Sequence, residues 1–183
     1  MKYLFPVIFL LVFLIFGIEL GYTATSPWWT RVTYIFQHAN LMHLLVNSVS
    51  FFFLFRALES MLRPRRITLT ALAAAVAAAF LCVYDKPVVG ASGMVYAMVG
   101  IYVALVVQYW NGKFRHPKTR YQVTVFLVAV TIALVVSFFK ENTAGMLHLV
   151  SMVLGFAGQF TIESIYKHVK YKKNERENAR AFK

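Results

Sequence analysis

The sequence has few charged residues, few acids and a single cysteine. Only 14% of its 183 residues are charged while 60% are hydrophobic, whereas a soluble domain carries about 25% charged residues. Long apolar runs with so little charge exclude a large soluble core and indicate a polytopic membrane protein. The lone Cys82 excludes an intrachain disulfide and a cysteine-based metal site, and its apolar neighbours predict that it packs in the interior.

The small number of acidic residues excludes two further classes of membrane enzyme. Asp85 is the one aspartate, which excludes a membrane aspartyl protease with its pair of intramembrane aspartates. A zinc protease helix needs His-Glu-x-x-His, and the stretch from His38 to His43 has neither that spacing nor a glutamate. Repeated halves with broken helices, which are typical of carriers, are absent from the pattern, although a small channel or carrier stays as a minor alternative. We expect neither a metal nor a cofactor.

Six apolar runs predict an all-α bundle of six transmembrane helices. The first run follows Lys2 and could be a signal peptide, but it is long enough to span and no small-residue cleavage site directly follows it. The stretch 21–40 is predicted to be an interfacial loop, because its tryptophans and tyrosines suit the headgroup region. The predicted helices cover about 3–20, 41–62, 67–84, 92–110, 121–139 and 145–166, and a lysine-rich tail follows at 167–183.

The distribution of positive charge predicts the orientation. The net charge of +12 could suggest a nucleic-acid partner, but about sixteen of the nineteen Lys and Arg lie on one side of the six spans. The exceptions are Arg31, Lys86 and Lys140. This positive-inside bias predicts that both termini and the basic tail are cytoplasmic and that no nucleic acid is bound. The tail is expected to be solvated and within reach of anionic lipid, and the oligomeric state is left open.

Polar side chains gather at the starts of the second, fourth and sixth predicted helices. The second begins with His43 and Asn47, which are four residues apart and therefore on one helix face. The fourth begins with Ser92, followed by Tyr96 at the same spacing, and the sixth carries His148 near its start. Because polar groups are costly inside a membrane, we expect these side chains to face inward, to pair and to mark a site.

Serine and histidine suffice for acyl transfer. An imidazole such as that of His148 can take the proton of Ser92, whose oxygen then attacks a carbonyl group. The oxyanion that forms needs donors, and His43, Asn47 and the backbone N–H groups around Ser92 are available. Asp85, in the loop before Ser92, is the only acid that could complete a triad. The pattern favours a Ser–His dyad with Tyr96 packed against the imidazole.

Each of these residues has a commoner structural role when taken alone. A serine beside glycine in a membrane helix usually packs or bonds to its own backbone, and a lone histidine or asparagine usually joins two helices. His38 is expected to be such a structural residue, holding the loop by a hydrogen bond. The conjunction of Ser92, His148, His43 and Asn47 at one membrane depth favours the site.

Three motifs give the sequence a family resemblance. It resembles the rhomboid intramembrane serine proteases of the compact six-helix prokaryotic type, over most of the chain from about Arg31 to Phe160. The motifs are G-A-S-G at 90–93 with Tyr96, H-x₄-H-x₃-N at 38–47, and His148 followed by the small residues Ser151 and Gly155.

The resemblance implies a six-helix protease domain at 1–166 in a bacterial inner membrane, with the active site open to the extracytoplasmic side. It implies Ser92 as nucleophile and His148 as general base and acid, and it assigns the oxyanion hole to His43, Asn47 and the Ser92 backbone. The substrates would be transmembrane segments of other proteins. The alternative is a rhomboid-like pseudoprotease that binds membrane clients without cleavage. The supporting residues would be Gly90, Gly93, His38 and Tyr96.

The resemblance also suggests a gate and a packing seam. The fifth helix with a cap at 139–145 would be the substrate gate, and the loop 21–40 would be the membrane-embedded first loop. Small residues on the fourth and sixth helices would let these helices approach and bring His148 to Ser92. These residues are Gly93, Ala97, Gly100, Ser151 and Gly155. The sequence departs from the family pattern at Phe55-Arg56, Leu147, Ser151 and Trp29-Thr30-Arg31.

Overall fold

The computed structural model describes residues 1–16, 20–139 and 144–181. Within these ranges the chain is helical apart from loops and one isolated antiparallel bridge between Tyr22 and Val88. The helices are α1 (Leu4–Ile15), α2 (Thr30–Thr33), the 3-10 turn η1 (Tyr34–Phe36), α3 (Leu41–Glu59), α4 (Pro64–Leu81), α5 (Ser92–Tyr109), α6 (Pro117–Phe139) and α7 (Gly145–Ala181).

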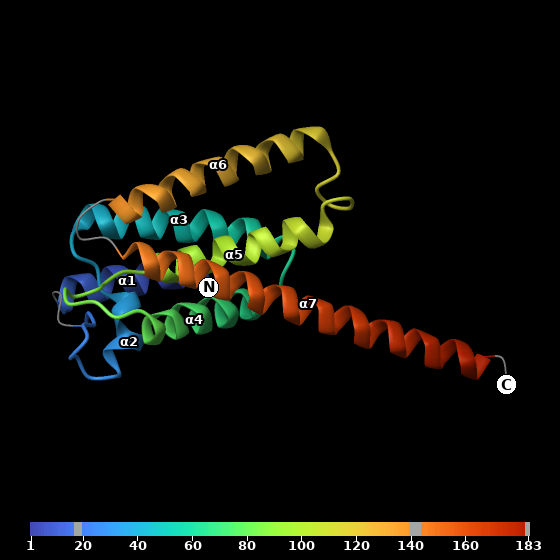
Figure 1. The fold of residues 1–183 in the computed structure, drawn as a ribbon, viewed down its shortest axis with the longest axis horizontal. Helices are drawn as coiled ribbons and strands as arrows, with labels where there is room; N and C mark the ends of the chain where they lie inside the picture. The colour runs from blue at the N-terminus through green and yellow to red at the C-terminus, as the bar shows by residue number, and fades with distance from the viewer. Residues whose placement is uncertain (17–19, 140–143, 182–183) are drawn as a thin grey trace.

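Helix α5 is the centre of the bundle. It packs against α7, α4 and α3, and eleven of its eighteen residues are buried. Figure 1 shows that α3, α5 and α7 all start at the end where α1, α2 and the α4–α5 loop lie, while α4 and α6 run in the opposite direction. The first turns of α3, α5 and α7 therefore lie at the same end of the molecule.

Five of the described helices, α3 to α7, are long and apolar enough to cross a membrane. The prediction of an all-α, polytopic membrane bundle is thus confirmed. Helix α1 has 12 residues and is about 18 Å long, which is shorter than the roughly 30 Å hydrocarbon core of a bilayer. The predicted first span at 3–20 also includes residues outside the described ranges, so a count of six spans stays a prediction.

The start of α4 differs from the sequence-based expectation because of a proline. The predicted helices 41–62 and 67–84 leave the basic stretch 63–66 outside both helices, whereas α3 ends at Glu59 and Pro64 is the first residue of α4. Proline is favoured at the first helical position, where its missing N–H would be unpaired anyway and its fixed φ suits the helix. Pro117 starts α6 in the same way, four residues before the predicted start at 121.

The last helix is longer than the predicted sixth span. Helix α7 continues past residue 166 to Ala181, so the described part of the basic tail is helical. Its side chains from Ser164 to Glu175 are exposed, and Figure 1 shows this part of α7 extending beyond the other helices.

Helices α5 and α7 pack closely against each other at glycine residues, which form the small-residue seam. A Cβ atom added to Gly155 would lie 2.2 Å from the Ala97 carbonyl oxygen, and one added to Gly100 would lie 1.9 Å from the Met152 carbonyl oxygen. The two backbones are therefore as close as glycine alone permits, as in the small-residue contacts of membrane helices. This contact fixes the position of the start of α7 relative to the start of α5.

Helix α6 is the least buried of the long helices. Only Val123 and Ser137 are buried along its length, and most of its other side chains are exposed. The predicted gate combines this helix with a cap at 139–145, and residues 140–143 of that cap lie outside the described ranges.

Candidate active site

A sharp turn at Gly90 delivers Ser92 to the first position of α5. Gly90 has φ of +117°, a conformation that residues with a Cβ atom rarely adopt. Its N–H donates to the Tyr34 carbonyl oxygen at 2.8 Å, which ties the turn to η1. A Cβ atom at this position would lie 2.6 Å from His43 Cε1. Both the backbone conformation and the contact with His43 therefore require glycine.

The turn places Ser92 directly beside His148. The distance between Ser92 Oγ and His148 Nε2 is 2.9 Å, although the two residues are 56 positions apart in the sequence. The Tyr96 ring lies flat on the imidazole, with 4.4 Å between ring centroids and 17° between planes. His148 is buried, and its Nδ1 has no hydrogen-bond partner among the described residues. Asp85 is exposed and makes no bond to this nitrogen.

The first turn of α7 is held by Tyr84, which the sequence analysis did not single out. The Leu147 N–H donates to the Tyr84 hydroxyl oxygen at 2.9 Å, one residue before His148. The first N–H groups of a helix have no partner within that helix, so a hydroxyl group from the α4–α5 loop satisfies one of them. An aromatic residue between a helix end and an Asp-Lys-Pro loop was the only sequence signal for this contact.

Tyr84→Phe is expected to loosen the start of α7. It removes the acceptor of a buried N–H group, because Leu147 is fully buried, and such a loss costs about 1–3 kcal/mol. We expect a lower melting temperature in detergent. Tyr121 is exposed, so Tyr121→Phe is the control, and equal behaviour of the two variants would contradict a positioning role for Tyr84.

His43 and Asn47 lie on the other side of the Ser92 turn. The Asn40 side chain caps α3 by accepting the His43 N–H at 2.8 Å, and Asn47 Nδ2 donates to the His43 carbonyl oxygen at 2.9 Å. A Cβ atom on Gly90 would be 2.9 Å from His43 Nε2 and 3.5 Å from Asn47 Nδ2. Two side-chain nitrogens of α3 thus approach the backbone two residues before Ser92.

His38 packs beside the same turn and forms a hydrogen bond with its backbone. It is 1% exposed, and its ring contacts those of Phe9 and His43, at 5.4 and 5.3 Å between centroids. Its Nε2 accepts the Ala91 N–H at 3.4 Å, which only the unprotonated nitrogen can do. Burial lowers the pKa of His38 to about 4. The neutral ring that this bond needs is therefore the stable form at neutral pH.

Acidification is expected to destabilise the protein through His38. The folded pKa of about 4 is below the value of about 6.5 for an unfolded chain, so between these values the unfolded state binds more protons and stability falls as pH falls. The loss at pH 5 relative to neutral pH is about 2 kcal/mol by this linkage. Thermal unfolding in detergent at pH 5 to 8 measures it. His38→Gln, which keeps an acceptor but cannot titrate, is expected to flatten the slope, and an unchanged slope would contradict the assignment.

The loop 20–40 is anchored to α4 and to the Ser92 turn by contacts that the sequence did not reveal. The Arg31 guanidinium donates to the carbonyl oxygens of Ala79 and Cys82, and the Tyr34 hydroxyl donates to the Ala75 carbonyl oxygen at 3.0 Å. Gly93 lies against this loop, since a Cβ atom there would be 2.7 Å from the Tyr34 hydroxyl oxygen. The position of Arg31 on the side with few positive charges was the one hint of a special role.

No group of three or more metal-ligating side chains is found in the part of the chain that the structure describes. The site consists of a serine, three histidines, an asparagine, a tyrosine and the backbone of a glycine-rich turn, supplied by α3, α5, α7 and the loop before α3. This donor set is chemically suited to proton transfer and to binding a developing negative charge on oxygen.

Comparison with known proteins identifies the fold. The family model of the Rhomboid domain matches residues 25–164, which include every residue of the site. The chain belongs to the rhomboid family. This rhomboid is 31% identical over 148 residues to the Bacillus subtilis protein named "Putative rhomboid protease YdcA", covering 79% of this chain and 71% of that protein. The match confirms a rhomboid-type bundle and a multi-pass integral membrane protein.

Two mammalian rhomboids match a shorter part of the chain. Rhomboid-related protein 3 of Homo sapiens is 40% identical over 87 residues, and that of Mus musculus is 39% identical over 87 residues. In both comparisons the match covers 46% of this rhomboid and 22% of the relative. These relatives therefore share one segment of the bundle with it.

Proposed function

We propose that this rhomboid is an intramembrane serine endopeptidase with Ser92 as nucleophile and His148 as its base. The observation that carries the proposal is the 2.9 Å distance between Ser92 Oγ and His148 Nε2, together with the Tyr96 ring stacked on the imidazole. A nucleophile and a base within hydrogen-bond distance, with the base held by a third group, is the arrangement that covalent acyl transfer needs.

In the proposed reaction, Ser92 Oγ attacks the carbonyl carbon of a peptide bond while His148 Nε2 takes the hydroxyl proton. The C–N bond then breaks, and His148 passes the proton to the leaving amine. Water attacks the acyl-enzyme in the second half, with His148 again as base, and releases the acid and free Ser92. Because His148 Nδ1 has no partner among the described residues, the stacked Tyr96 and the packing of α7 orient the ring in this scheme.

His43, Asn47 and the Ser92 N–H are the proposed donors to the tetrahedral oxyanion. Two observations support this role: Asn47 Nδ2 has a second hydrogen left after bonding to the His43 carbonyl oxygen, and His43 Nε2 lies near Gly90, two residues before Ser92. The removal of one oxyanion donor typically costs about 10²–10³ in turnover. Gly90, Gly93 and His38 would keep the donors in place through the contacts described above.

The proposed substrates are transmembrane segments of other membrane proteins. The site lies at the first turns of three membrane helices, so a scissile bond would be reached near one end of a substrate helix. Together with the positive-inside distribution of Lys and Arg, this predicts cytoplasmic termini and a site that opens to the opposite side of a bacterial inner membrane.

The test is cleavage of reporter proteins with one transmembrane segment, including segments with small and helix-breaking residues, by the purified chain in liposomes. Wild type is expected to cleave at least one reporter and to be labelled by a fluorophosphonate, and Ser92→Ala is expected to lose both activities. Ser164→Ala changes an exposed serine near the middle of α7 and is the matched control. Equal cleavage by Ser92→Ala would refute the proposal, and absence of labelling and cleavage in wild type would favour the pseudoprotease alternative.

A further inference from the structure

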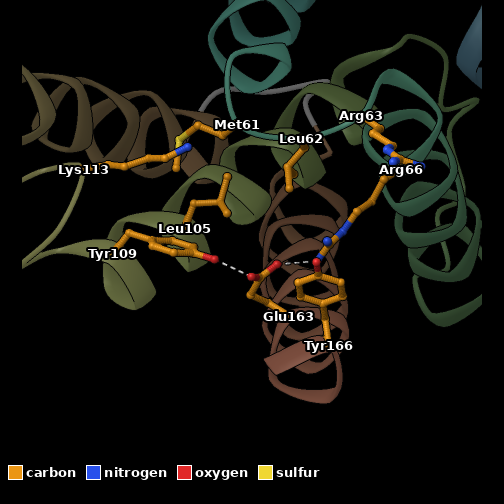
Figure 2. A pocket seen from close by; sticks show the side chains of 9 residues that line it. All are labelled: Met61, Leu62, Arg63, Arg66, Leu105, Tyr109, Lys113, Glu163 and Tyr166. Carbon is orange, nitrogen blue, oxygen red and sulfur yellow. Dashed lines mark hydrogen bonds and ion pairs between the residues drawn. The ribbon is translucent and has the colours of Figure 1, made fainter. Parts of the chain in front are cut away.

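A cavity with polar and apolar lining residues lies at the end of the bundle opposite the candidate active site. Its volume is about 510 Å³, within the usual range for small-molecule sites. It is lined by the α3–α4 turn, α4, α5, the α5–α6 loop and α7 (Figure 2). Tyr109, at the end of α5, lines it, whereas Ser92 is at the start of the same helix, about 25 Å away by helix length. The proposed proteolysis therefore does not use this cavity.

Three polar residues of the cavity, Arg66, Glu163 and Tyr109, are joined by hydrogen bonds. Glu163 is the only acidic lining residue of the cavity and is buried. One carboxylate oxygen accepts from Arg66 Nη2 at 3.0 Å and the other accepts from the Tyr109 hydroxyl, as Figure 2 shows. The charge of Glu163 is thus matched by one guanidinium group. The buried Nε of Arg66 still has no partner among the described residues.

Two further cations line the cavity without a partner. Arg63, in the α3–α4 turn, and Lys113, in the α5–α6 loop, make no hydrogen bond or ion pair through their side chains with any described residue. In the view of Figure 2 they lie on either side of Met61 and Leu62. Once Glu163 and Arg66 are paired, the cavity has two exposed positive charges that no acid of the described residues neutralises.

The remaining wall is apolar. Met61, Leu62 and Leu105 line it, and Tyr166 forms part of the rim. A cavity with two unmatched cations, free guanidinium and ammonium donors and an apolar wall fits a ligand with an anionic head and a hydrocarbon part. Its place at the ends of membrane-spanning helices is where phospholipid headgroups lie, and basic pockets between such helices are suited to these headgroups.

We propose that this cavity binds the phosphodiester headgroup of an anionic phospholipid. Arg63 and Lys113 hold the phosphate through charge-assisted hydrogen bonds, and the first part of an acyl chain lies along Met61 and Leu105. A soluble phosphate ester offers the same phosphate chemistry but leaves the apolar wall uncovered. The bound lipid links the α3–α4 turn to the α5–α6 loop, so it also raises the thermal stability of the protein.

The test is lipid titration of the full chain in neutral detergent, followed by native mass spectrometry and thermal unfolding. The probes are phosphatidylglycerol, zwitterionic phosphatidylcholine and soluble glycerol 3-phosphate. Wild type is expected to bind phosphatidylglycerol at least about tenfold more tightly than the other two probes and to melt at a higher temperature with it. The double variant Arg63→Ala/Lys113→Ala is expected to lose this preference, with about tenfold weaker binding of phosphatidylglycerol.

A charge-matched control separates the cavity from the general surface potential. Arg65→Ala/Lys118→Ala removes two exposed cations in the first turns of α4 and α6. Neither residue lines the cavity, and this variant is expected to change binding less than twofold. Arg63→Lys/Lys113→Arg is expected to keep the binding. Equal losses in the cavity and control variants, or equal affinity for phosphatidylcholine, would overturn the proposal. Equal affinity for glycerol 3-phosphate would show that the cavity binds soluble phosphate esters as well as lipid headgroups, and would overturn the assignment to a lipid.

Discussion

His148→Ala is expected to lower the turnover of a transmembrane reporter by about 10²–10⁶-fold. The lower bound follows from the loss of a general base, and the upper bound from a serine protease that loses its histidine. The variant is also expected to lose fluorophosphonate labelling of Ser92, because the hydroxyl at 2.9 Å from Nε2 would no longer have an acceptor for its proton. A gel-based cleavage assay and probe labelling measure the two effects.

Two comparisons make this result specific to the base. His116→Ala changes an exposed histidine in the loop before α6 and is expected to leave turnover unchanged. His148→Ala is also expected to melt at a lower temperature, because the buried ring stacks on Tyr96 and its truncation leaves a cavity, so turnover is compared at a temperature where the variant is still folded. A variant that folds normally and still cleaves at a wild-type rate would show that another group takes the serine proton.

Gly155→Leu is expected to separate the pair without removing either residue. A Cβ atom on Gly155 already lies 2.2 Å from the Ala97 carbonyl oxygen, and this contact is with backbone, which cannot rotate away as a side chain can. Helices α5 and α7 must therefore move apart, and a 1 Å misplacement of catalytic groups can cost about 100-fold. We expect at least that loss of cleavage, with a lower melting temperature from overpacking.

Gly158→Ala is the control on the same helix. A Cβ atom there meets only the Thr70 methyl group, at 3.3 Å, so a small shift of a side chain accommodates it. Retained proteolysis in a well-expressed Gly155→Leu protein would contradict the seam as the device that joins Ser92 and His148. Similar losses in the Gly155→Leu and Gly158→Ala proteins would show general sensitivity of α7 instead.

Composition and charge sufficed to predict the class of fold, because a bilayer permits few alternatives to a helical bundle. The helix starts at Leu41, Ser92 and Gly145 coincide with changes from polar to apolar sequence. The start of α4 was misplaced because a proline within a basic stretch reads either as a stop or as a first helical residue. The continuation of α7 to Ala181 could not be predicted from hydropathy, which does not distinguish an exposed charged helix from a solvated coil.

The residue types of the candidate site could be predicted from the sequence, but the loop contacts that hold these residues in place could not. Serine, histidine and asparagine stand out in a membrane helix because they are costly there. The bonds of Tyr84 to Leu147 and of Arg31 to the end of α4 join loops to helix ends. Such contacts depend on how the loops fold over the bundle, and no spacing rule relates residues that are 48 or 63 positions apart.

The wide sequence separation within the Ser92–His148 pair has a consequence for biosynthesis. The two residues are 56 positions apart, and ribosomes add about 5–20 residues per second, so about 3–11 seconds pass between the synthesis of one and of the other. During this interval a nascent chain with Ser92 already made has no His148 to pair with. The proposed proteolysis, which depends on the pair, would therefore begin only after α7 has entered the bilayer and docked on α5.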